Sequence, residues 1–224
     1  MKREVISTLD GSKTIYIEEM DETYHSSHGA IQEARHVFIL NGLEPMLNKN
    51  LKIFELGFGT GLNAILTSEF AKENDKVIEY HGVEAFPVEL SMALEMGYTV
   101  MIGNSSTIDF EQLHKCTWDK LENITPQFSL KKIKSKIQDL KLPKEYFDLI
   151  YYDAFGPRAQ SEMWEIDVLL KIHDSLKDQG VLVTYCAQGQ FKRNLKALGF
   201  TVQSLPGPPG KREMTRAIKN QCFF

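Results

Sequence analysis

The chain has 224 residues, of which 42% are hydrophobic, and its formal net charge is -4 at pH 7. This length and apolar content predict a single domain over residues 1–224, and the weakly acidic balance excludes a general nucleic-acid-binding polycation, so any RNA contact would need a local basic patch. No apolar run approaches the ~20 residues that span a bilayer, and the N-terminus lacks the apolar region of a signal peptide, which predicts a cytoplasmic protein without membrane contact.

Residues 1–48 predict a small appendage on the domain. Asp10-Gly11 stands between two short strands in the segment 4–18, and this dipeptide is a strong signal for a β-hairpin. A helix with one apolar face follows over 31–47. We expect the hairpin and the helix to cover a crevice in the core formed by residues 49–224.

No metal site is expected in this chain. His25 and His28 lie three positions apart, but no third ligand stands nearby. The three cysteines, Cys116, Cys186 and Cys222, are widely spaced and form no C-x-x-C pair. The sequence therefore predicts neither a zinc site nor a disulfide framework.

A glycine-rich turn organises the core. The segment 53–63, IFELGFGTGLN, predicts a strand, a tight turn and the start of a helix over 62–72. Glycines allow positive φ and a close backbone approach, and a helix N-terminus presents free N–H groups, so the turn is suited to hold a ligand. Glu55 before the turn disfavours a pyrophosphate, whereas the E-x-G-x-G-x-G spacing suits the cationic amino-acid part of S-adenosylmethionine. A glycine-rich turn without a ligand is the alternative.

The residues expected to bind this cofactor come from the turn and its borders. They are Glu55, Gly57, Phe58, Gly59, Thr60, Gly61 and Asn63. Glu84 joins them because it ends the next predicted strand, 77–84, where a carboxylate commonly binds the ribose hydroxyls of a nucleotide.

The segment after Glu84 predicts helices over 88–96 and 111–121 and a strand over 128–140. One side of this strand is strongly basic and predicts a solvated edge strand. Its lysines are Lys131, Lys132, Lys134 and Lys136.

Asp153 follows an apolar run over 146–152 that predicts a central strand, which places Asp153 at the same crevice as the glycine turn. The loop Asp153-Ala154-Phe155-Gly156-Pro157 resembles the D/N-P-P-Y/F loop of methyltransferases that act on amino groups. Asp153 would accept a hydrogen bond from an amine and also lie beside the cofactor, and Phe155 would stack on the substrate base. We therefore expect Asp153 and Phe155 to be catalytic; the alternative is that Asp153 only caps the next helix. Whether Asp153 also removes a proton is open.

Strands and helices continue to alternate to the end of the chain. Helices are predicted over 165–177 and 190–198, a strand over 181–187, and a closing antiparallel pair over 200–205 and 214–218. This alternation around one crevice predicts an open α/β sheet.

Four segments, in this order, resemble the methyltransferase domain of the MnmC/MnmD family of tRNA wobble-uridine modifying enzymes. They are FELGFGTGLN, YYDAFGPRAQSEMW, VLVTYCAQGQFKRNLKALGFTV and PGPPGKREM. The upstream segment DETYHSSHGAIQEARHVFILNGL is similar to the N-terminal region of the same family. The resemblance implies a Rossmann-like class I S-adenosylmethionine-dependent methyltransferase fold, with a mostly parallel seven-stranded sheet, a C-terminal antiparallel hairpin and an N-terminal hairpin and helix.

The resemblance also implies a reaction. A methyl group would pass from S-adenosylmethionine to the exocyclic amine of 5-aminomethyl-(2-thio)uridine in the tRNA anticodon, giving the 5-methylaminomethyl product. Family proteins often carry a fused FAD oxidase domain that makes the amine. This chain ends at Phe224, so we expect a separate enzyme to supply the aminomethyl substrate.

The resemblance fails at one point, because the family usually has a Gly-Asp pair whose Asp reads the adenine. The corresponding segment here, 134–139, has no such pair, and Asp139 is the candidate that remains. Substrate contacts are expected from aromatic, proline and basic residues, and Lys211-Arg212 is the best supported because it follows a Pro/Gly loop. The expected substrate-binding residues are Tyr24, Pro157, Trp164, Arg193, Lys211 and Arg212.

Three other functions fit the same pattern. The first is methylation of a small amine or a protein side chain, the second is aminopropyl transfer of the spermidine-synthase type, and the third is RNA binding without catalysis, since a fold alone does not establish an activity. For each basic residue the alternative to an RNA contact is an ordinary solvated charge.

Overall fold

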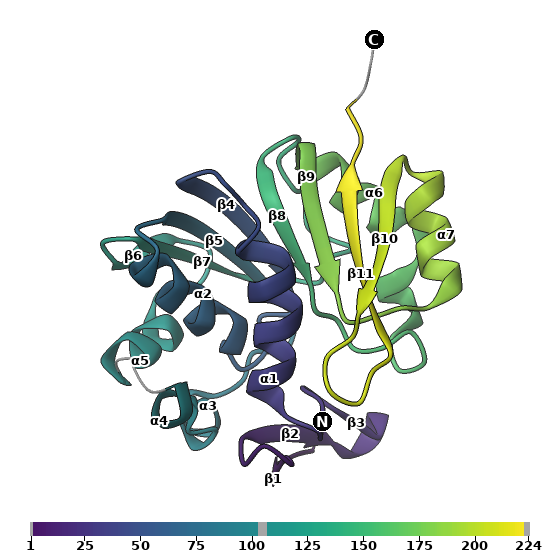
Figure 1. Cartoon of the computed structure of the whole chain (residues 1–224). Coiled ribbons are helices and arrows are strands. Elements are labelled where there is room, and N and C mark those ends of the chain that lie inside the picture. The colour runs from purple at the N-terminus through teal and green to yellow at the C-terminus, as the bar shows by residue number, and fades with distance from the viewer. Residues whose placement is uncertain (1, 103–106, 222–224) are drawn as a thin grey trace.

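A computed structural model describes residues 2–102 and 107–221 of the chain (Figure 1). Its described part contains one large sheet with strands in the order β10-β11-β9-β8-β4-β5-β7-β6. These strands are β4 (Asn50–Leu56), β5 (Val77–Glu84), β6 (Leu121–Thr125), β7 (Phe128–Lys134), β8 (Phe147–Tyr152), β9 (Leu176–Thr184), β10 (Phe200–Pro206) and β11 (Glu213–Lys219).

The five strands from β7 to β9 are parallel to one another, and β11 and β10 follow as an antiparallel pair at one edge. This arrangement confirms the predicted mostly parallel sheet with its C-terminal antiparallel hairpin. From β4 the chain first adds strands on one side, β5 and β7, and then on the other side, β8 and β9. In sheets with such a change of direction, ligands bind at the carboxyl ends of the strands next to it.

The described chain adds an eighth strand, β6, which the sequence did not predict and whose first residue, Leu121, fell in the predicted helix over 111–121. The helix ends at Lys115 instead, and β6 pairs with β7 in antiparallel fashion. The prediction that the lysine-rich strand forms an edge is therefore wrong, since β7 lies between β5 and β6. Lys132 is buried, donates a hydrogen bond to the carbonyl of His114 and places its Nζ 4.7 Å from the centroid of the Trp118 ring.

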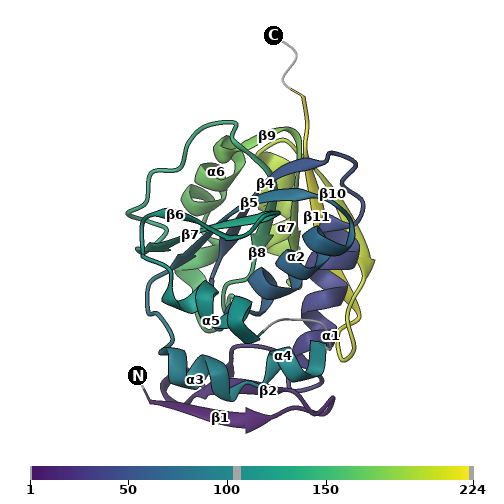
Figure 2. The ribbon, with the colours of Figure 1, turned by 90° about the vertical axis from the view of Figure 1, so that its left-hand side faces the viewer.

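A separate small sheet is formed by β1 (Arg3–Ser7), β2 (Lys13–Ile17) and β3 (Glu22–Thr23), which confirms the N-terminal hairpin. Its turn is held by Asp10, whose Oδ1 accepts hydrogen bonds from the Thr8 hydroxyl at 2.7 Å and from the Ser12 N–H at 2.9 Å. Figures 1 and 2 show this sheet lying beyond the carboxyl ends of the parallel strands.

Helices cover both faces of the large sheet. They are α1 (Ala30–Ala34), which continues into a π-helical stretch over Arg35–Leu43, α2 (Leu62–Glu73), α3 (Leu90–Glu95), α4 (Tyr98–Ile102), α5 (Thr107–Lys115), α6 (Ile166–Ser175) and α7 (Gly189–Ala197), with 3-10 turns at Glu18–Met20 and Ser161–Trp164. Figure 2 shows α1 and α2 on one face and α6 and α7 on the other. The predicted helix over 31–47 thus ends earlier, at Leu43.

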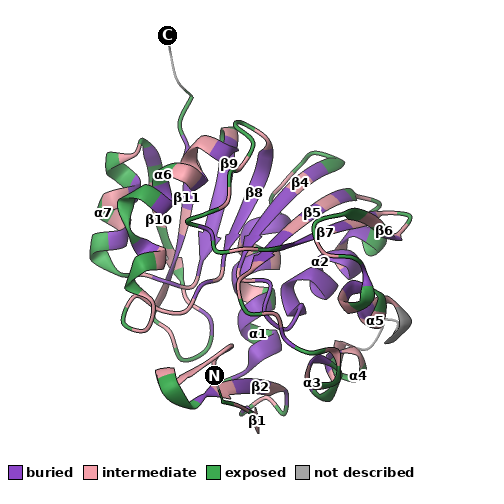
Figure 3. Ribbon diagram, turned by 180° about the vertical axis from the view of Figure 1, so that it is seen from behind, coloured by how far each residue is buried: buried purple, intermediate pink, exposed green. Residues whose placement is uncertain are grey.

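The core joins the N-terminal elements to the sheet. One apolar cluster contains Ile15 of β2 and Phe38 of the π-helical stretch together with Ile53 of β4, and another packs α6 and α7 on the opposite face. Figure 3 shows the middle strands buried between these layers. No helix within residues 2–102 and 107–221 is long and apolar enough to cross a membrane.

Candidate active site

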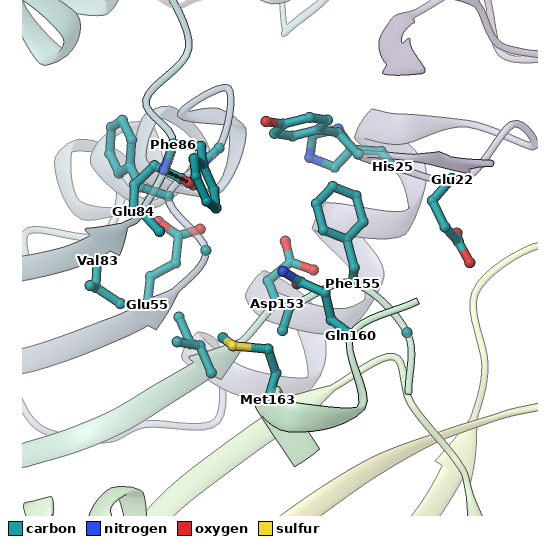
Figure 4. A pocket seen from close by; sticks show the side chains of 18 of the residues that line it. Glu22, His25, Glu55, Val83, Glu84, Phe86, Asp153, Phe155, Gln160 and Met163 are labelled. Carbon is teal, nitrogen blue, oxygen red and sulfur yellow. Dashed lines mark hydrogen bonds between the residues drawn. The ribbon is translucent and has the colours of Figure 1, made fainter. Parts of the chain in front are cut away.

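A cavity of about 800 Å³ lies between the carboxyl ends of β4, β5 and β8 and the N-terminal sheet (Figure 4). Figure 4 shows Glu84 on one side of this cavity and Phe155 on the other. Most of the residues that the sequence predicted as site residues line it: Tyr24, Glu55, Gly57, Phe58, Gly59, Thr60, Asn63, Glu84, Asp153, Phe155 and Lys211. The structure therefore brings the glycine turn, the acids Glu55 and Glu84, and the Asp153 loop into one site.

The glycine turn is fixed to its neighbouring strand ends. The N–H groups of Gly57 and Phe58 donate to the carbonyl of Val83 at 3.1 and 3.0 Å. Gly57 has a φ of +94°, and a Cβ there would lie 2.4 Å from the carbonyl oxygen of Asp153, so no larger residue fits. Gly61, with a φ of 76°, caps the N-terminus of α2 behind the turn.

Glu84 is held in place by backbone donors. Its Oε2 accepts the N–H of Gly59 at 3.0 Å, and its Oε1 accepts the N–H of Phe86 at 2.8 Å. A carboxylate has about four acceptor sites, so these bonds leave capacity on both oxygens. This orientation fits the predicted contact with a ribose diol.

Segment 134–139 continues the wall of the cavity beyond Glu84. The N–H of Ser135 donates to the carbonyl of Glu84 at 3.2 Å, and Asp139 has an exposed side chain on the lining. Asp139 therefore remains the candidate for reading the adenine.

Asn63 links the buried Glu55 to the half-buried Asp153. Its Nδ2 donates to Glu55 Oε1 and to Asp153 Oδ2, each at 2.8 Å. Glu55 is fully buried, and within the described chain neither its Oε2 nor Asn63 Oδ1 has a hydrogen-bond partner. Buried acceptors without donors are costly and favour a cationic ligand. This pair of acceptors fits the ammonium group of S-adenosylmethionine, which donates hydrogen bonds.

The pKa values of these carboxyls are unusual. Burial raises the pKa of Glu55 well above its ordinary value. Burial also raises the pKa of Asp153 to about 7, with the nearby Glu33 carboxylate adding to the rise and the Asn63 hydrogen bond and Lys211 opposing it. Displaced carboxyl pKa values in a cavity are typical of functional sites.

The aromatic residues form the far wall of the cavity. The rings of Tyr24 and Phe155 meet edge to face, with centroids 5.2 Å apart. Trp164 does not line the cavity: it is buried, and its Nε1–H donates to the carbonyl of Phe155 at 2.8 Å. Trp164 therefore positions the loop from behind. Pro157 also lies outside the lining.

The basic residues are spread over a wider surface. Lys211 lines the cavity, while exposed Arg212 lines an adjacent hollow of about 530 Å³ that shares Tyr185 and Lys211 with it. Arg193 is exposed on α7, lies outside both linings and donates to Gln190 Oε1 at 2.8 Å. The structure thus groups Lys211 with Arg212 and leaves Arg193 apart.

The cavity side chains that sequence reasoning did not identify include His25, Glu33 and Tyr185. Burial lowers the pKa of His25 to about 4, and its Nδ1 has no partner in the described chain. Glu33 forms an ion pair with Lys211, and the Tyr185 hydroxyl donates to the carbonyl of Ala154 at 2.7 Å. Helical spacing could have identified Glu33, because it stands four positions before Val37 and so on the buried side of the helix.

No group of three or more His, Cys, Asp or Glu side chains suited to a metal ion occurs in residues 2–102 and 107–221. Cys116 and Cys186 are buried free thiols, and Cys222 lies outside the described residues.

Comparisons with known proteins agree with the geometry. A family model described as S-adenosyl-L-methionine-dependent methyltransferase matches residues 108–220. A protein of Marinomonas sp. (strain MWYL1), named tRNA 5-methylaminomethyl-2-thiouridine biosynthesis bifunctional protein MnmC, is 33% identical over 88% of this chain and 31% of its own length. The protein of the same name from Cupriavidus metallidurans is 28% identical over 93% of this chain and 33% of its own length.

The crystal structure of MNMC2 from Aquifex aeolicus shows the same fold, with a TM-score of 0.75 at 24% identity over 96% of this chain and 69% of that one. This chain spans about a third of the length of the curated relatives that it matches. The resemblance to the methyltransferase part of MnmC proteins is thereby confirmed. The chain belongs to the family of S-adenosyl-L-methionine-dependent methyltransferases, and S-adenosyl-L-methionine is its cofactor.

Proposed function

We propose that the chain methylates the exocyclic amine of 5-aminomethyl-(2-thio)uridine at the wobble position of tRNA. The observation that carries this proposal is the position of Asp153 and Phe155 at the end of the cavity, opposite Glu84 and beside Tyr24. An acceptor for an amine next to an aromatic wall for a base fits an extruded nucleotide that bears an amine. The names of the relatives from Marinomonas and Cupriavidus, which refer to 5-methylaminomethyl-2-thiouridine, support the same substrate.

The cofactor would be held by the glycine turn and its flanking acids. Glu84 would bind the ribose hydroxyls, and Glu55 Oε2 with Asn63 Oδ1 would accept hydrogen bonds from the ammonium group. When bound, S-adenosylmethionine supplies a methyl group on a positively charged sulfur, which an amine lone pair can attack. Gly57, Phe58, Gly59, Thr60 and Gly61 give the backbone that lies against it.

Asp153 would act on the amine. Its carboxylate accepts a hydrogen bond from the amine N–H and so orients the lone pair, which lowers the entropic part of the barrier. Because burial raises the pKa of Asp153 to about 7, its Oδ atoms can also hold a proton that leaves the amine near neutral pH. Phe155 and Tyr24 would hold the uracil ring and keep water from the amine.

The tRNA would lie over the rim formed by Lys211 and Arg212, with Arg193 further out on α7. These residues would contact phosphates, which position an RNA without reading its sequence. Pro157 would lie at the same rim, and Trp164 would act through Phe155. A tRNA substrate supports the expected cytoplasmic location, and a separate enzyme would supply the aminomethyl group.

We infer that residues 1–48 and 49–224 act together as one methyltransferase domain. The N-terminal elements contribute the segment 22–27, with Tyr24 and His25, and also Glu33 to the cavity, while the glycine turn, Glu84 and the Asp153 loop come from the core. Both parts also share one apolar cluster.

The test is an incubation with labelled S-adenosylmethionine and tRNA that carries the aminomethyl group, followed by digestion and identification of the labelled nucleoside. We expect labelled 5-methylaminomethyl-2-thiouridine. Labelling of the free nucleoside but not of tRNA would show a small-molecule methyltransferase. Binding of tRNA without labelling would show an RNA-binding protein of the same fold.

A further inference from the structure

An ion pair between the buried Glu33 and the half-buried Lys211 stands at the substrate end of the cavity. Glu33 on α1 is only 6% exposed, and its Oε2 pairs with Lys211 Nζ from the loop between β10 and β11. The other oxygen, Oε1, accepts the N–H of Ser26 at 3.2 Å. Figure 1 shows this loop reaching down beside α1. Both side chains line the same cavity as Asp153, so an ammonium group already sits among the acids of the site.

The surroundings of Lys211 resemble a binding site for an ammonium ion. Its Nζ lies 4.1 Å from the centroid of the Tyr185 ring, in addition to its pair with Glu33. A carboxylate and an aromatic face are the groups that proteins use to bind cationic amines. Tyr185 donates to the carbonyl of Ala154, which connects this corner to the residue after Asp153.

Glu33 and Lys211 also act on Asp153. The carboxylate of Glu33 raises the pKa of Asp153 and the ammonium of Lys211 lowers it, although burial has the largest effect. The three charged groups therefore form one cluster. A purely structural link between the loop and α1 would gain little from this pair, because the cost of removing the Glu33 carboxylate from water offsets much of its attraction to the half-buried Lys211.

We propose that Glu33 is a binding group for the primary amine of the substrate and that Lys211 occupies its place until the substrate displaces it. This inference rests on the proposed function only in that the substrate carries a primary amine. Glu33 would exchange one ammonium partner for another, so the cluster keeps the same charge and no buried carboxylate is left unpaired. The released Lys211 would then be free to meet a phosphate at the rim.

The exchange would give the site a preference for amines. A neutral hydroxymethyl group cannot replace the ammonium of Lys211, and a buried charge without a partner is strongly unfavourable. A substrate that lacks the amine would therefore have to bind with Lys211 still in place.

The experiment measures binding without turnover. Calorimetry of the protein saturated with S-adenosylhomocysteine would compare 5-aminomethyluridine with 5-hydroxymethyluridine as free nucleosides. We expect the wild-type protein to favour the amine by about tenfold or more and Glu33→Gln to lose this preference. We expect Lys211→Met to bind the amine severalfold more tightly than wild type, because its internal competitor is gone, with no gain for the hydroxymethyl compound.

Lys177→Met is the matched control, because Lys177 pairs with Asp148 at 2.7 Å away from the cavity lining. It should bind both nucleosides as the wild type does. Melting temperature and affinity for S-adenosylhomocysteine report whether each variant folds. If Glu33→Gln fails to fold, Lys211→Met decides alone, since only displacement predicts tighter amine binding on loss of the lysine.

The inference is overturned if Glu33→Gln keeps the wild-type preference, if Lys211→Met gains no affinity for the amine, or if wild-type protein binds neither nucleoside. These results differ from a failure of the proposed function. Amine binding that depends on Glu33 in a protein that does not methylate tRNA would reject the tRNA substrate alone. If the protein methylates tRNA but Glu33→Gln binds the amine as the wild type does, only this inference is rejected.

Discussion

Asn63 is the residue that holds the two carboxyl groups of the site together. One amide group donates to both Glu55 and Asp153 and so holds two carboxyls close together. Burial makes it costly for both to be ionised without a cation. In the proposed function, a cationic cofactor would balance these negative charges, so the acids of the site would be binding groups and not only structural ones.

Replacement of Asp153 should separate chemistry from binding. Asp153→Ala removes the acceptor that orients the amine, so we expect turnover to fall by about 100-fold or more, while cofactor affinity is largely kept through Glu84 and the glycine turn. Single-turnover kinetics and calorimetry with S-adenosylmethionine measure the two effects. Turnover at the wild-type rate would refute the assignment of Asp153.

Cofactor affinity should depend on pH near neutrality. Burial, with a further contribution from Glu33 and against the opposing effect of Lys211, raises the pKa of Asp153 to about 7, and burial also raises that of Glu55, so the free protein holds extra protons. A bound cation lowers both pKa values, so binding releases protons and affinity rises as the pH increases through about 7. Calorimetry in buffers of different ionisation enthalpy measures this release. Adenosine, which carries no cationic group, is the control and should bind without the rise.

The glycine turn between β4 and α2 is the element that we propose to bind the cofactor. It is tied to β5 through the carbonyl of Val83 and packs against the backbone of Asp153 at Gly57. The ends of three neighbouring strands therefore keep their relative positions. This rigidity places Glu84 and Asp153 on opposite sides of the same cavity.

Gly57→Ala should disrupt this element. The new Cβ would lie 2.4 Å from the carbonyl oxygen of Asp153 at a φ of +94°, so the turn must shift. We expect at least a tenfold loss of cofactor affinity and a lower melting temperature. Gly156→Ala is the control from the same region, because its Cβ would meet only the Tyr185 hydroxyl, at 3.8 Å. Equal behaviour of the two variants would contradict a special role of the turn.

The whole molecule is acidic, yet its cavity opens beside basic side chains. The net charge is -4, and Lys211 and Arg212 stand together at the rim between the cavity and the adjacent hollow. A local cluster of this kind can bind RNA without a basic overall charge. The rim also joins elements that lie far apart in the chain, since Lys211 meets Glu33 across 178 positions.

Binding of tRNA should weaken with salt, because phosphate contacts release counterions. Arg212→Ala removes one such contact, so we expect the slope of log affinity against log salt to become shallower by about one. Lys49→Ala is the control, since Lys49 pairs with Asp75 near the amino end of β4. Titrations at several salt concentrations measure the slopes. An unchanged slope for Arg212→Ala would remove this residue from the RNA surface.

The sequence by itself determined the parts of the site that follow from local pattern. The glycine turn and Asp153 directly follow apolar strands, and Glu84 is the last residue of its strand. Parallel strands bring their carboxyl ends together without further information. The hairpin at Asp10-Gly11 was predictable for the same reason, because its turn is stabilised by neighbours in the chain.

Only the tertiary structure decided which polar side chains are buried and with whom they pair. Lys132 was expected to be solvated, but it is buried on a strand that β6 covers. Trp164 was expected to bind the substrate, but it lies behind the Asp153 loop. Glu33 meets Lys211 through the packing of α1 against the β10–β11 loop. The sequence could not predict these partners, because the periodicity of apolar residues shows only which side of a helix or strand is apolar. The partner of a buried charge is set by the packing of distant elements, which no local pattern encodes.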